Sequence, residues 1–126
     1  MDRRRIERAV VAVIVLAFAF GTVTHALDFL RFGWAPYRFG PPLLNLFWNA
    51  LVALDAIIVG LFVARMRRSA LVAALTVMVA DVAANSYAWR WLDLPEFATS
   101  VPIQSAFLCL LVGAAPFLWP KAPAAA

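Results

Sequence analysis

Four long apolar stretches, separated by short polar segments, dominate the pattern of this sequence. They run from about 6–30, 42–64, 69–91 and 101–119. A helix that crosses a bilayer needs about 20 mostly apolar residues, and each stretch is close to that length. Short connections favour antiparallel neighbours. The pattern therefore predicts an all-α polytopic membrane protein whose four transmembrane helices form an antiparallel bundle.

The bundle is expected to occupy residues 1–120 as a single domain, followed by a disordered tail over 121–126, which is rich in alanine and proline. The first stretch has one alternative interpretation. Its basic start and the small residues around His25 resemble a signal peptide with a cleavage site. The apolar run continues beyond that site through Phe29 and Leu30, which favours a retained helix.

Basic residues cluster on one side of the predicted membrane topology. If all four stretches cross, eight of the 11 lysines and arginines lie on the side that holds both termini, and only Arg31, Arg38 and Arg90 lie on the other. Cytoplasmic segments carry the excess of such residues. Both termini are therefore predicted to be cytoplasmic, in a bacterial inner membrane.

Composition narrows the function classes. The chain is 65% hydrophobic and 14% charged, whereas soluble domains have about 45–50% apolar and 25% charged residues. This excludes a soluble enzyme, a disordered chain and a nucleic-acid-binding domain. One cysteine, Cys109, excludes an internal disulfide, and one histidine, His25, excludes a multi-histidine metal site. No metal and no cofactor are expected.

The polar residues that we assign to the membrane interior, from His25 to Gln104, all fall at the midplane or in the outer half of the predicted membrane. Asp55 and Asp81 lie near the middle of their stretches, where a carboxylate is costly and so a candidate for function by default. We expect them to form the floor of a pocket open towards the outer face or the outer leaflet. The expected walls are His25, Asp28, Asn49, Asn85 and Gln104, with Trp48 and Trp89 as aromatic surfaces.

Structural roles compete with this interpretation for some of these residues. Asparagine and glutamine often hydrogen-bond between transmembrane helices as packing contacts. Asp28 can pair with Arg31, one helical turn away. Asp55 and Asp81 are the hardest to explain in this way, because packing rarely needs a carboxylate at the midplane. Together with His25, they are the candidate catalytic residues.

The order of these polar residues resembles the EXPERA group, which contains the emopamil-binding sterol isomerases and the sigma-2-type receptor. The corresponding residues are His25 with Asp28, then Asp55 where that group has a glutamate, then Ala80-Asp81-Val82 with Asn85, and finally Gln104 with Pro116. The resemblance implies a four-helix core with cytoplasmic termini. It also implies a pocket for an amphipathic, often cationic or sterol-like ligand, with or without isomerase chemistry.

General chemistry allows the same ligand class, since a buried aspartate pairs with an amine and tryptophan faces attract cations. The leading hypothesis is therefore a membrane protein that binds membrane lipid or a small amphipathic ligand. One alternative is a small proton-coupled transporter that acts as a homodimer and uses Asp55 or Asp81 as its proton carrier. Another is an accessory subunit of a membrane complex, whose aspartates pair with a membrane-protein partner. Nucleic acid is not an expected partner.

Overall fold

The structure is a computed structural model that describes residues 2–120. The segment 121–126, which contains Lys121 and the predicted tail, lies outside the described residues. Within 2–120, all the regular secondary structure is helical, in four helices: α1 (Arg3–Phe32), α2 (Pro42–Val63), α3 (Arg67–Trp91) and α4 (Phe97–Leu118). All four are long and apolar enough to cross a membrane. The predicted all-helical fold, with four helices long and apolar enough to span a membrane, is thus confirmed.

Local residue chemistry explains where the first two helices begin and end. The Asp2 side chain accepts a hydrogen bond from the backbone N–H of Arg4, which caps the start of α1. Gly33 ends that helix at φ 81°, a conformation that glycine adopts without steric cost. Pro42 occupies the first position of α2, where a missing N–H costs nothing. The residues that flank the apolar stretches therefore determine where these two helices begin and end.

Two helices begin at least three residues earlier than the sequence pattern predicts. α1 starts at Arg3 rather than near residue 6, because arginine is a good helix former and Arg3 pairs with Glu7 one turn later, at 3.1 Å. α4 starts at Phe97 rather than near residue 101. The Phe97 ring stacks on Trp48, with centroids 5.1 Å apart. A tertiary contact therefore extends this helix into the segment that the pattern left as a connection between two apolar stretches.

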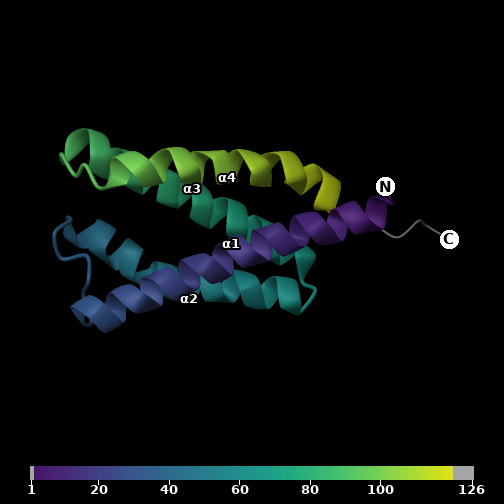
Figure 1. Ribbon diagram of the computed structural model, residues 1–126, viewed down its shortest axis with the longest axis horizontal. Coiled ribbons are helices and arrows are strands. Elements are labelled where there is room, and N and C mark those ends of the chain that lie inside the picture. The colour runs from purple at the N-terminus through teal and green to yellow at the C-terminus, as the bar shows by residue number, and fades with distance from the viewer. Residues whose placement is uncertain (1, 121–126) are drawn as a thin grey trace.

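The helices lie lengthwise beside one another, with two distinct ends (Figure 1). At one end, the arginine-rich end, the start of α1, the α2–α3 connection and the end of α4 come together. Arg67 contacts Glu7 at 3.4 Å there, and Arg68 donates to the Pro120 carbonyl oxygen at 3.5 Å. The opposite end, the loop end, holds the connections 33–41 and 92–96.

The helices pack as two pairs around an apolar core. α1 lies mainly against α2, and α4 against α3, and the contact between α1 and α4 is the smallest among the helix pairs that touch. In Figure 1, these two helices diverge towards the loop end. Ile14, Ile58, Leu71 and Leu111 are fully buried between the helices. Many large apolar side chains face outwards instead, as a hydrocarbon environment permits. The divergence of α1 and α4 creates the room for the site described next.

Candidate functional site

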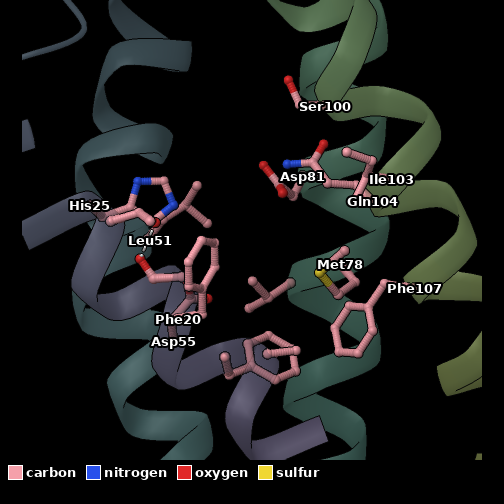
Figure 2. Close-up of a pocket in the computed structure, with 15 residues that line it drawn as sticks. Phe20, His25, Leu51, Asp55, Met78, Asp81, Ser100, Ile103, Gln104 and Phe107 are labelled. Carbon is pink, nitrogen blue, oxygen red and sulfur yellow. Dashed lines mark hydrogen bonds between the residues drawn. The ribbon is translucent and has the colours of Figure 1, made fainter. Parts of the chain in front are cut away.

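A cavity of about 450 Å³ lies between α1 and α4, with α2 and α3 behind it (Figure 2). Its size falls within the range of about 300–1,000 Å³ that is typical of ligand pockets. The lining is mostly apolar, with polar side chains from all four helices. It consists of Ala17, Phe18, Phe20, Gly21, Thr24, His25, Leu51, Asp55, Val77, Met78, Asp81, Ser100, Ile103, Gln104 and Phe107.

Exposure of the lining residues shows where the cavity opens. Phe20 on α1 and Ile103 on α4 are 71% and 65% exposed. Asp55 on α2 and Asp81 on α3 are only 7% and 6% exposed. The two carboxylates therefore lie at the back of the cavity, and the two apolar side chains flank its mouth. The opening faces sideways, between α1 and α4, through the apolar surface of the helices.

Polar and apolar groups separate along the cavity. His25, Ser100 and Gln104 line it towards the loop end, whereas Phe18 and Phe107 line it towards the arginine-rich end. Figure 2 shows His25 on one wall, across from Asp81 and Gln104, with Met78 and Phe107 farther along the cavity. The space is therefore suited to a molecule that is polar at one end and apolar at the other.

Asp55 has an unusual environment for a buried carboxylate. Within residues 2–120, it receives no hydrogen bond from another side chain or from the backbone. Its oxygens are open to the cavity. Gly21 of α1, which also lines the cavity, approaches so closely that an added Cβ would overlap Oδ2 of Asp55. The absence of a side chain at Gly21 therefore leaves the space that the Asp55 carboxylate occupies.

We expect the Gly21→Ala substitution to destabilise the protein by about 1–2 kcal/mol, because the new methyl group overpacks against Asp55. Gly60→Ala is the matched control, since a Cβ there meets nothing within 4 Å. An alanine in mid-helix is otherwise about 0.5–1 kcal/mol better than glycine. Unfolding titrations in mixed micelles should show the loss for Gly21→Ala only, and Asp55→Ala should remove it. Equal stability of the two alanine variants would contradict the contact.

Asn85 holds the back of the cavity together. Its Oδ1 accepts a hydrogen bond from Nε1 of Trp48 at 2.7 Å. Its Nδ2 donates to Oδ1 of Asp81 at 3.1 Å and to Oε1 of Gln104 at 2.9 Å. Asn85 is only 3% exposed, and these partners use both hydrogens of its amide group and one acceptor site of its oxygen. One asparagine therefore connects α2, α3 and α4 and orients two cavity-lining residues.

Trp48 is the centre of an aromatic cluster behind the cavity. It stacks on Phe97, and Tyr37 meets it edge to face at a centroid distance of 6.0 Å. The ring of Phe39 lies 5.7 Å away. An added Cβ at Gly40 would clash with the indole, so the connection 33–41 packs tightly over it. Trp48 therefore anchors the loop end of the bundle rather than facing a ligand.

Tyr37 joins His25 to Asp28. The Tyr37 hydroxyl lies 2.7 Å from Nδ1 of His25 and donates to Oδ2 of Asp28, also at 2.7 Å. Burial and the hydrogen bond to Asp28 raise the pKa of the Tyr37 hydroxyl above its ordinary value, so this group stays protonated. Asp28 makes no ion pair with Arg31 within the described part of the chain. The sequence alone does not indicate this role for Tyr37, because nothing local links it to a histidine 12 positions earlier.

The structure divides the predicted site residues into three groups. His25, Asp55, Asp81 and Gln104 line the cavity. Asp28, Trp48 and Asn85 lie outside the lining but bind residues connected to it. Asn49 and Trp89 do neither, within the residues that the structure describes.

Helix geometry accounts for these placements. Trp48 shares the face of Asp55, but seven residues put it about 10 Å farther along the helix, beyond Leu51. Asn49 is turned by about a third of a helical turn from Asp55. Trp89 lies two turns beyond Asp81 and is 36% exposed. A shared helix face therefore indicates which way a side chain points. Whether that side chain lines the cavity also depends on how far the cavity extends along the helix.

Sequence reasoning missed the apolar part of the lining, including Phe20, Met78, Ile103 and Phe107. In a transmembrane helix, such residues look the same whether they face lipid, core or ligand. Within 2–120, no three histidine, cysteine, aspartate or glutamate side chains gather closely enough to hold a metal ion. Comparisons with protein-family models, curated proteins and solved structures give no match to this chain.

Proposed function

We propose that this chain is an integral membrane protein that binds a small amphipathic ligand carrying a cationic amine, within the cavity between α1 and α4. The observation that carries the proposal is the environment of Asp55. A buried charge is expensive unless it is paired, and Asp55 has no protein partner among the described residues. A ligand ammonium would supply the missing charge and hydrogen bond.

The shape and polarity of the cavity support an amphipathic ligand that arrives from the membrane. The exposed side chains at its mouth, Phe20 and Ile103, are apolar. A ligand dissolved in the bilayer can therefore enter sideways without crossing a polar surface. Its apolar body would lie beside Phe18 and Phe107, and its polar groups would face Asp55, Asp81 and His25.

The proposal includes an orientation in the membrane. The arginine-rich end would face the cytoplasm, as would both termini, and the four helices would cross as an antiparallel bundle in a bacterial inner membrane. Arg3, Arg67 and Arg68 at that end support this orientation through the usual excess of basic residues on the cytoplasmic side. The cavity, with its polar groups towards the loop end, would then lie in the outer half of the membrane.

The resemblance to the EXPERA group becomes part of the same proposal. Four of the residues that carry it, His25, Asp55, Asp81 and Gln104, line one cavity. This convergence supports an EXPERA-like binding site for amines or sterols. A proton-coupled transporter would need a polar route towards the arginine-rich end, where the lining is instead apolar, with Ala17, Phe18 and Phe107. We therefore do not propose transport.

Thermal unfolding of the purified protein in detergent tests the proposal. A panel of amphipathic amines would be compared with neutral molecules of the same skeleton, in which an amide replaces the amine, and with sterols. A ligand that binds only the folded state stabilises it by about 2.7 kcal/mol at 100 times its Kd. We expect an upward shift in Tm for the amines and less for their neutral counterparts. No shift with any member of the panel would overturn the proposal.

A further inference from the structure

The single hydroxyl hydrogen of Tyr37 determines which ring nitrogen of His25 carries a proton. A tyrosine hydroxyl has a single hydrogen, and Tyr37 donates it to Oδ2 of Asp28. Because this one hydrogen is donated to Asp28, it is not available to His25. The 2.7 Å contact between the Tyr37 oxygen and Nδ1 of His25 must then be supplied by a hydrogen on Nδ1.

The partner of one ring nitrogen sets the state of the other. A neutral imidazole with its proton on Nδ1 has a bare lone pair on Nε2. Within residues 2–120, Nε2 has no hydrogen-bond partner in the protein, and His25 lines the cavity. Figure 2 shows the ring at the cavity wall, across from Asp81 and Gln104. Nε2 is therefore available to a molecule in the cavity, as an acceptor.

We propose that Asp28 and Tyr37 are positioning residues, which hold His25 in the Nδ1–H tautomer so that Nε2 accepts a hydrogen bond from the ligand. The tautomer of His25 depends only on residues of the protein and does not require a bound ligand. The ligand contact rests on the proposed function and deepens it. The ligand carries two kinds of donor: an ammonium group for the carboxylates of Asp55 and Asp81, and a hydroxyl or N–H group for His25. An amphipathic amino alcohol has this chemistry.

Nitrogen NMR of the imidazole tests the tautomer directly. His25 is the sole histidine in the sequence, so protein labelled with ¹⁵N-histidine gives a single, unambiguous pair of ring signals. At neutral pH and without ligand, we expect Nδ1 to be protonated and Nε2 to be unprotonated. A wild-type spectrum with the proton on Nε2, or with both nitrogens protonated, would overturn the assignment.

Two substitutions should move the proton by different routes. Tyr37→Phe removes the acceptor for the Nδ1 hydrogen and keeps the aromatic packing against Trp48. Asp28→Ala leaves Tyr37 free to donate its hydrogen to Nδ1. Both are expected to shift the proton to Nε2, and either one suffices if the other does not fold. Tyr87→Phe is the matched control, since Tyr87 is 50% exposed, and it should leave the ring signals unchanged. Retention of the Nδ1–H form in the two test variants would refute the positioning role.

The ligand contact has its own readout. Wild-type protein would be titrated with an amphipathic amino alcohol and with its O-methyl ether, which keeps the amine but lacks the hydroxyl hydrogen. We expect the alcohol, and not the ether, to shift the Nε2 signal and to bind about 10-fold more tightly. Equal effects of both compounds would refute the contact with His25 and leave the amine site at Asp55 standing. Binding of neither would refute the proposed function, whereas the tautomer result stands without any ligand.

Discussion

The Asp55→Asn variant is expected to lose the stabilisation that amphipathic amines give to the wild-type protein. The substitution keeps the size of the side chain and removes the charge that faces the cavity. A hydrogen bond to a charged group contributes about 1.5–3 kcal/mol. At about 1.4 kcal/mol per tenfold change, the Kd of an amine ligand should rise about 10- to 150-fold. Thermal unfolding across a ligand concentration series measures the change.

The same variant should be at least as stable as the wild type when no ligand is present. Asp55 is 7% exposed and has no hydrogen-bond partner in residues 2–120, so replacing it with a neutral amide removes the cost of burying a charge. A carboxylate with a purely structural role would behave in the opposite way, because its loss would lower the Tm in the absence of ligand. The combination of undiminished stability and lost binding is therefore the signature of a ligand site.

Asp93→Asn is the matched control for this substitution. Asp93 is exposed in the connection between α3 and α4 and has a φ of 52°, a conformation that asparagine tolerates well. Its removal should change neither the Tm nor the response to amines. If Asp55→Asn were as responsive to amines as this control, Asp55 would not be the group that recognises the ligand.

The Asn85→Ala variant is expected to show the largest loss of stability. It breaks the hydrogen bonds to Trp48, Asp81 and Gln104, which lie on three different helices. Hydrogen bonds between transmembrane helices have been found to contribute about 0.6 kcal/mol on average and about 1.7 kcal/mol at most. Asp81 lies on α3 together with Asn85, so two of the three bonds join different helices, and these two suggest a loss of about 1–3 kcal/mol in the free energy of unfolding. Titration with SDS in mixed micelles measures this quantity.

Asn49→Ala makes the same truncation at a position without these contacts. Oδ1 of Asn49 is buried and has no hydrogen-bond partner in the described chain, so little favourable energy is lost with it. Its free energy of unfolding should change by less than about 0.5 kcal/mol, as for substitutions away from a specific interaction. If the two asparagine variants lost similar stability, general side-chain packing rather than the Asn85 network would hold the helices together.

The network also explains why sequence reasoning only partly predicted the site. Asp81 and Asn85 are four residues apart, so their hydrogen bond follows from helix periodicity alone. The bond between Trp48 and Asn85 joins residues 37 positions apart, and no local pattern indicates it. The same holds for His25 and Tyr37, because Tyr37 lies in a connection whose path depends on aromatic packing around Trp48.

The sequence by itself determined the four helices, their membrane-spanning length and the positions of the polar residues along them. These properties follow from the spacing of apolar residues and from the cost of placing charge in hydrocarbon. It also identified Asp55 and Asp81 as the carboxylates that packing does not explain. Each of these features belongs to a single helix, so the order of residues along that helix is enough to predict it.

Only the tertiary structure decided which of these residues meet. The divergence of α1 from α4 creates the cavity, and the apolar side chains at its mouth, Phe20 and Ile103, could not be distinguished from lipid-facing residues beforehand. It also placed Gly21 against Asp55 and Tyr37 between His25 and Asp28. The physical reason is that periodicity determines which way a side chain points along its own helix. The relative tilt and position of neighbouring helices depend on how all their side chains pack together.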